Sequence, residues 1–431
     1  MRMKWTSTAL ACGLMVLAHT ASGAEPFDLK GLIRTAIQTN PQILSQQASV
    51  KSSQALLKTA DWQYYPTPSV SVEKVSSPAE DSLYVDGARV KTLRLQQSLY
   101  TWGRLSAGSS KAAAQLQSSE AALEEVKQQL AIRVAQSYVD AVSAAQRVQA
   151  YQRGIEAHER FLALIQRRIE QGVSARSEMV LVVSRLEQMR ADQMTALATE
   201  KSAWSHLTQL VGQDLDRPNV VTETYRPIRV SAAALLVQAK QHSPNLEKLW
   251  AQATVAKWEM EEQSASLYPE LYVRVERQIG NYAPANSHLP PINRVFVGMT
   301  TSLGAGLSSL TRVEALNARY QASLEDVRNA ERSLSDEINT SAAQLEATQR
   351  KVKALVAAAA QSEDLEASGE RQFLAGKKTW LDLMNTSRER IQTDVQLIDA
   401  QANALLLKWR LGLFADPVEV VIEPHYFEAY Q

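Results

Sequence analysis

Cysteine, proline, glycine and aromatic residues are all scarce in this sequence, and two of these shortages limit the possible structures. Cys12 is the only cysteine, so an intramolecular disulfide cannot form. The 14 prolines leave long gaps, and none lies between Pro291 and Pro417. Because proline is the residue that most strongly breaks a helix, nothing in the backbone chemistry of that stretch forces an interruption.

An excess of one charge sign is also absent. The 46 basic and 46 acidic residues give a formal net charge of zero, and both signs are interspersed along the chain. A nucleic-acid partner is therefore not expected, because such proteins carry basic blocks. Beyond the N-terminal segment, no run of 18 apolar residues occurs, so no helix is expected to cross a membrane.

Residue patterns for catalysis or metal binding are missing as well. The histidines beyond residue 24 are scattered and lack the paired spacing of metal ligands. Gly304-Ala-Gly306 lacks the third glycine of a phosphate-binding loop. We therefore expect no enzyme activity, no metal site and no cofactor.

The N-terminus has the pattern of a secretory signal. Arg2 and Lys4 precede an apolar run from Ala9 to Ala18, and the small residues 21–24 follow it. This pattern predicts a signal peptide over residues 1–24. A membrane anchor is the alternative, but the apolar run is only about half as long as a spanning helix needs. A lipoprotein site at Cys12 has poorly fitting preceding residues.

Apolar periodicity predicts very long helices. Val313, Tyr320, Val327 and Leu334 are spaced by sevens, with polar residues between them, which is typical of a coiled-coil seam. We predict two helices of about 66 residues, Leu105–Gln171 and Leu310–Ala375, each roughly 100 Å long. Two shorter helices, Asp28–Trp62 and Ser177–Val211, are expected to lie end to end beside the first.

The two halves of the chain repeat each other. Residues 32–73 and 235–276 align without a gap at an offset of 203, with Pro41 matching Pro244 and Pro66 matching Pro269. A period of this size indicates a duplicated half rather than a solenoid. We expect a first repeat over residues 25–212, with a strand pair at about 66–100 and a hairpin tip near 172–178. A linker, 213–234, leads to a second repeat over residues 235–412, with a strand pair at about 269–303 and a tip near 373–382. An irregular tail, 413–431, ends the chain.

The predicted strands alternate between apolar and polar residues. Val70 and Val72 face one way, whereas Ser69, Ser71 and Glu73 face the other. About ten residues of such alternation is typical of membrane barrels, although any half-buried sheet gives the same pattern. Four strands cannot close a barrel, and an open edge in lipid leaves backbone groups unpaired. The pattern therefore predicts an oligomer.

Together the signal, the duplicated half, the strand pairs and the glycine-tipped hairpins resemble the TolC family of outer-membrane efflux and secretion ducts. The resemblance implies a mainly helical fold with four strands per chain. Three copies would form a twelve-stranded β-barrel on a twelve-helix periplasmic tunnel, in the outer membrane of a Gram-negative bacterium. It also implies contact with outer-membrane lipid, a periplasmic adaptor and an inner-membrane transporter, with an ABC-type transporter favoured over a proton-driven pump.

The resemblance places a gate at the tips. Lys378 and Asp382 match the family's basic position and first acidic position, and Glu178 lies where the family has a tethering Asp. Phe373 replaces the family's Tyr and lacks its hydroxyl, and Asn385 replaces the second Asp, so a trimer would have one acidic ring instead of two. The alternative is that these are ordinary solvated residues beside a helix turn.

The same tips are where the resemblance places docking of an adaptor. The residues expected there are Gly172, Val173, Ser174, Gly376, Lys377 and Thr379.

Three functions remain open from the sequence. The first is a passive exit duct for type I secretion of a large, adhesin-type protein, favoured by the unlipidated start and the single acidic ring. The second is the outer-membrane component of a small-molecule efflux pump. A soluble periplasmic coiled-coil scaffold or adaptor is a distant third, because both halves carry matching alternating strands.

Overall fold

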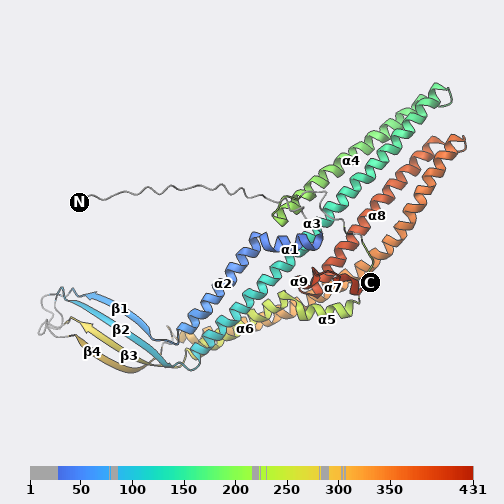
Figure 1. Cartoon of the computed structure of the whole chain (residues 1–431). Helices are drawn as coiled ribbons and strands as arrows, with labels where there is room; N and C mark the ends of the chain where they lie inside the picture. The colour runs from blue at the N-terminus through green and yellow to red at the C-terminus, as the bar shows by residue number, and fades with distance from the viewer. Residues whose placement is uncertain are drawn as a thin grey trace, which may run out of the picture.

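The computed structural model shows an elongated molecule with a small sheet at one end and two helical hairpin tips at the other (Figure 1). The predicted signal segment, most of both strand-connecting loops and part of the linker lie outside the described residues. The structure describes residues 28–76, 78, 86–215, 223, 225–229, 231–280, 282, 291–301, 304 and 307–430.

Each repeat consists of two short helices, a strand pair, a long helix and a medium-length helix. The first repeat contains α1 (Leu29–Thr39), α2 (Pro41–Trp62), β1 (Thr67–Lys74), β2 (Arg89–Tyr100), α3 (Arg104–Glu170) and α4 (Arg176–Val211). The second contains α5 (Ala232–His242), α6 (Pro244–Ala265), β3 (Glu270–Ile279), β4 (Ile292–Thr300), α7 (Ser308–Leu374) and α8 (Trp380–Ala415). Both long helices have 67 residues, close to the predicted length.

The prediction of one helix over Asp28–Trp62 is wrong, because the chain breaks at Asn40. Asn40 is extended, and its side chain accepts a hydrogen bond from the Gln42 N–H at 2.9 Å, which caps α2. Pro41 follows as the first helical residue, where its missing N–H has no cost. Ser243 and Pro244 make the same break between α5 and α6.

The two shorter partners of α3 do lie along it one after the other, as predicted (Figure 1). Where they meet, the Thr39 hydroxyl donates to the Val211 carbonyl at 2.7 Å, and the Asn40 side chain donates to the Leu210 carbonyl at 3.4 Å. These bonds satisfy carbonyl groups at the C-terminal end of α4 that have no partner inside the helix.

The main hydrophobic core lies at this junction, in the middle of the molecule. It combines residues of α1, α3, α4 and α8, including the fully buried Ile33, Tyr138, Leu207 and Trp409. A second cluster joins α5, α7 and α8 around Ile338. The long helices are therefore held at their middle, and both ends project from this core.

The C-terminal segment differs from the predicted irregular tail. α9 (Val418–Val421) and a 3-10 helix (Tyr426–Tyr430) follow α8, and Val421 and Phe427 are buried in the main core. The Phe427 ring lies edge-on to Trp409 with 5.0 Å between centroids. Burial of these apolar side chains supplies the stabilisation that orders the segment.

The four strands form one antiparallel sheet in the order β1-β2-β3-β4. β2 pairs with β3, so the strand pairs of the two repeats join into a single layer, with Leu95 opposite Val275. One face of this sheet is apolar and solvent-exposed in the single chain: Val70 is 70% exposed and Val297 is 72% exposed. We call it the apolar face.

The opposite face is polar and internally paired. Glu276 accepts from Arg94 Nε at 2.7 Å and lies 3.0 Å from Arg274 Nε, and the Arg274 guanidinium lies over the Phe296 ring. The ion-paired charged groups in the middle of the sheet thus lie on the polar face. Of the helices that the structure describes, none is both long enough and apolar enough to cross a membrane.

Candidate gate at the hairpin tips

Both tips turn at a glycine in the left-handed conformation, as the sequence predicted. Gly172 and Gly376 each have a φ of +72°. The N–H groups of the following residues, Val173 and Lys377, each donate at 2.9 Å to the carbonyl oxygen five residues earlier. This is the Schellman closure of a helix end, and a β-carbon at either glycine would strain it.

The helix after the second tip starts with a capping box that fixes Asp382. The Thr379 hydroxyl accepts a hydrogen bond from the Asp382 N–H at 3.2 Å, and the Asp382 carboxylate accepts from the Thr379 N–H at 3.3 Å. The same carboxylate lies 2.5 Å from the Thr379 hydroxyl oxygen. This capping role was not predicted from the sequence, although the Thr-x-x-Asp spacing at a helix start indicates it.

The same contacts keep Asp382 ionised. Hydrogen bonds from the Thr379 side chain and then its backbone, with the nearby Lys378 ammonium, hold the pKa of Asp382 below its ordinary value. The side chain is exposed. Asp382 therefore presents a permanent negative charge at neutral pH in a fixed position one turn into α8.

Lys378 lies against α7, and its ammonium group is near enough to Asp382 to help lower the pKa of that carboxyl. It is half-buried, and its Nζ would lie 3.3 Å from a β-carbon placed at Gly369. Within the described part of the chain, neither Lys378 nor Glu178 takes part in an ion pair. An ion pair of Lys378 or of Glu178 that held the tips shut would therefore have to join neighbouring copies.

Phe373 is buried in a hydrophobic cluster that joins the two tips. It is 5% exposed and packs on Trp380 at 5.4 Å between ring centroids, and Trp380 in turn packs on Phe161 of α3 at 5.9 Å. The Arg168 guanidinium lies 4.9 Å from the centre of the Phe373 ring. Phe373 thus couples the two hairpins of one chain through packing, whereas Asp382 is exposed.

Replacing Phe373 with alanine should loosen both tips together. Truncating a buried phenylalanine costs about 3–5 kcal/mol, and this one contacts residues of both hairpins. We expect faster amide hydrogen exchange in residues 161–182 as well as in residues 369–390. Leu374→Ala, which changes an exposed neighbour, is the matched control and should leave exchange unchanged. Faster exchange confined to the second tip would refute the coupling.

The remaining gate and docking residues are mostly exposed. Asn385 lies three residues after Asp382 on α8, so both share one face of the helix. Glu178 is half-buried in the first turn of α4. The predicted docking residues Gly172, Val173, Gly376, Lys377 and Thr379 are exposed, and Ser174 is half-buried.

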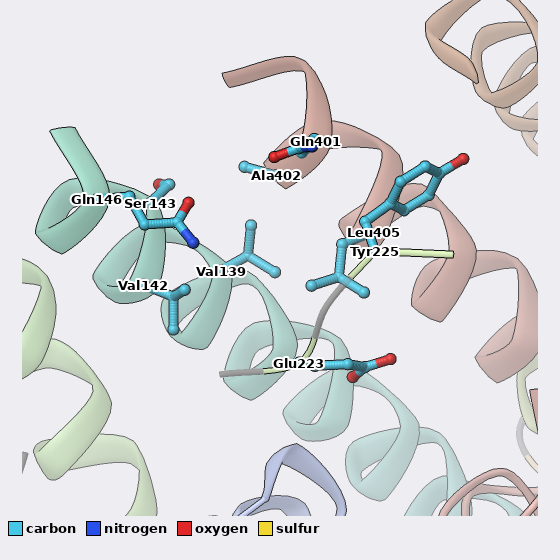
Figure 2. Close-up of a pocket in the computed structure, with 9 residues that line it drawn as sticks. All are labelled: Val139, Val142, Ser143, Gln146, Glu223, Tyr225, Gln401, Ala402 and Leu405. Atoms are coloured by element: carbon cyan, nitrogen blue, oxygen red, sulfur yellow. The ribbon is translucent and has the colours of Figure 1, made fainter. Parts of the chain in front are cut away.

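One pocket lies far from the tips, where the linker packs against α3 and α8. It lies between α3 and α8 beside the linker residues Glu223 and Tyr225 (Figure 2). The Glu223 carboxylate accepts from Trp409 Nε1 at 3.0 Å and lies 3.3 Å from Lys408 Nζ, and its N–H donates to the Tyr138 hydroxyl oxygen at 2.7 Å. Burial raises the pKa of Tyr138 to about 12. These contacts fasten the linker to both repeats.

The described residues contain no group of three or more metal-ligating side chains. The ion pairs of the described residues lie mainly along and between helices, such as that of Lys248 with Glu125 at 2.6 Å, with others on the sheet and at the linker.

The family described as "Outer membrane efflux protein" matches residues 32–213 and 235–410, one match for each predicted repeat. Two relatives are similar in sequence. Protein CyaE of Bordetella pertussis is 25% identical over 282 residues, which cover 64% of this chain and 58% of that protein. Alkaline protease secretion protein AprF of Pseudomonas aeruginosa is 22% identical over 333 residues, covering 76% of this chain and 69% of that protein.

Solved structures share the fold. A membrane protein from Pseudomonas aeruginosa superposes with a TM-score of 0.79 at 17% identity, covering 90% of both chains. The outer membrane protein VceC of Vibrio cholerae gives a TM-score of 0.77 at 18% identity, covering 90% of this chain and 96% of that one. The family match spans both repeats and confirms the predicted resemblance, so this chain belongs to the family of outer membrane efflux proteins.

Proposed function

We propose that this chain is the outer-membrane exit duct of a tripartite export system and that its main cargo is a protein secreted by a type I pathway. The observation that carries the duct is the sheet: its apolar face is exposed in the single chain, and β1 and β4 each have an unpaired edge. In lipid every backbone polar group needs a partner, so those edges must join other copies. Three copies supply twelve strands and close the barrel.

The proposal of protein secretion draws on the relatives. AprF is named as an alkaline protease secretion protein, and both sequence relatives align over more than half of this chain. A periplasmic adaptor would dock at the exposed tip residues, and an inner-membrane transporter, of the ABC type on this proposal, would supply the energy. The duct itself needs no cofactor.

Small-molecule efflux is the second candidate, because the description of the family names efflux. The soluble scaffold is not retained, since this is a family of outer-membrane proteins.

Deleting the coding sequence in the native bacterium separates the two candidates. We expect a protein to disappear from the culture medium and to accumulate in the cells, while sensitivity to dyes, detergents and antibiotics stays the same. Restoring the chain should restore secretion. Increased sensitivity with an unchanged set of secreted proteins would refute the secretion proposal in favour of efflux.

The oligomer is tested separately. After removal of residues 1–24, we expect the chain to be extracted from membranes as a detergent-stable trimer that dissociates to a monomer on heating. The reason is the cost of several kcal/mol for each unpaired backbone group at an open edge in lipid. A monodisperse monomer that folds without detergent would overturn both candidates.

A further inference from the structure

The apolar face of the sheet ends in basic residues at the end farthest from the helices. Lys74 of β1 pairs with Arg89 of β2, and Lys91 lies two residues further along β2. Arg277 of β3 pairs with Leu93 of β2. Because paired residues and alternate residues of antiparallel strands point to the same side, all four basic residues lie on the apolar face. We call these four residues the basic belt.

The charges of the basic belt have no ion-pair partner among the described residues. All four side chains are exposed, and none of them takes part in an ion pair with a described residue. The polar face differs, because Arg94 and Arg274 both contact Glu276 and Arg294 donates to Gln278 at 2.8 Å. These arginines of the polar face are thus paired with a carboxylate or an amide, whereas the basic belt on the apolar face carries a net positive charge.

Aromatic side chains mark the other end of the apolar face. Trp62, Tyr65, Tyr100, Trp102 and Tyr268 are exposed where the strands meet the helices, and Trp102 stacks on Tyr268 with 5.2 Å between centroids. Tryptophan and tyrosine are typical of the level of the lipid headgroups in membrane proteins.

The separation of the two ends fits a bilayer. From Tyr100 to Lys91 along β2 the strand advances by nine residues, or about 30 Å at ~3.3 Å per residue. Strands of membrane barrels are tilted by about 40°, so this length corresponds to roughly 23 Å along the membrane normal. The apolar band of membrane barrels is about 25 Å tall, which is close to this value. The basic belt and the aromatic residues therefore lie at opposite interfaces.

We propose that the basic belt binds the phosphate groups of anionic lipids in the outer leaflet. This inference rests on the proposed function, because it requires the apolar face to meet lipid. Lysine and arginine stems can lie over the apolar strands while their charged ends reach the headgroups. Arg89 and Arg277 can each bind a phosphate through two N–H groups. Three copies would carry three belts of four positive charges around the barrel.

The experiment measures lipid retention by the purified trimer. Trimers are reconstituted in nanodiscs of neutral phosphatidylcholine that contain a small fraction of diphosphorylated lipid A or of the same lipid with its phosphates removed. After brief detergent extraction, native mass spectrometry counts the lipid A molecules that remain bound. We expect the native trimer to retain the phosphorylated form many-fold better than the dephosphorylated form.

The belt variant combines Lys74→Gln, Arg89→Gln, Lys91→Gln and Arg277→Gln. Each basic side chain near an anionic surface contributes about five-fold to binding, so the preference should nearly disappear. The control removes the same charge from exposed helical lysines that form no ion pair with a described residue: Lys51→Gln, Lys58→Gln, Lys351→Gln and Lys353→Gln. It should retain lipid as the native trimer does.

Equal retention of both lipids by the native trimer would overturn the inference, as would a belt variant that keeps the preference. If the belt variant does not form trimers, Arg277→Gln alone replaces it. The comparison of phosphorylated with dephosphorylated lipid A on the native trimer still tests the inference in that case. Loss of the preference on adding inorganic phosphate at a concentration equal to that of the lipid would point to free phosphate and also overturn it. Failure of every variant and of the native chain to form membrane trimers would instead refute the proposed function.

Discussion

Val273→Arg should abolish nearly all membrane-inserted trimer. Val273 lies on the apolar face of β3, between Gln97 of β2 and Val297 of β4. An arginine near the middle of the bilayer costs about 2–4 kcal/mol, and three-fold symmetry repeats that cost in every copy, to roughly 6–12 kcal/mol. We expect the yield of heat-dissociable trimer in purified outer membranes to fall at least ten-fold.

The neighbouring residue provides the matched comparison. Arg274→Val changes the polar face, and Glu276 keeps its contact with Arg94, so insertion should be much less affected. Val273→Leu preserves the apolar character and should behave as the native chain does. If Arg274→Val impaired insertion more than Val273→Arg, the assignment of the two faces of the sheet would be reversed.

Removing the Asp382 charge should weaken cation block of the closed channel. The change must preserve the capping box, because the Asp382 carboxylate also accepts from Thr379. Asp382→Asn removes the charge and keeps an acceptor oxygen, which makes it a cleaner test than Asp382→Ala. In planar bilayers we expect half-block to require several-fold more multivalent cation, with selectivity shifting toward anions.

Adding a charge should have the opposite effect. Asn385→Asp places a second carboxylate one turn along the same exposed face of α8, so two rings of three would bind one cation together. Block should then occur at lower cation concentration. Asn385→Gln is the neutral control. Unchanged conductance, selectivity and block in both charged-residue variants would mean that Asp382 does not line the constriction, even if the trimeric duct is correct.

Several features of the fold could be predicted because they depend on local sequence. A seven-residue spacing such as that of Val313 and Tyr320 specifies a helix without reference to the rest of the chain. Gly172 and Gly376 end helices because only glycine adopts the left-handed conformation at no steric cost. The break at Asn40 is also local, since an Asn-Pro pair marks a helix start, although the sequence analysis predicted one continuous helix there.

The contacts of the candidate gate residues were predicted less completely than the fold. The resemblance identified Asp382 by position, and the structure adds the capping contact with Thr379 that fixes it. The resemblance also placed Phe373 among the gate residues, and the structure adds that its ring is buried in a cluster with Trp380. Its neighbour in the cluster, Phe161, belongs to the other repeat, so nothing in the sequence around residue 373 could reveal that contact.

By itself, the sequence determined the duplicated architecture, the lengths of the two long helices, the positions of the tips and the alternation of the strands, because each follows from periodicity or from one residue's backbone preference. The tertiary structure decided which distant segments meet. It buried Phe427 against Trp409, joined β2 to β3, and gathered Lys74, Arg89, Lys91 and Arg277 at one end of the apolar face. The physical reason is that burial and charge clustering depend on contacts across hundreds of residues, which local propensity does not encode.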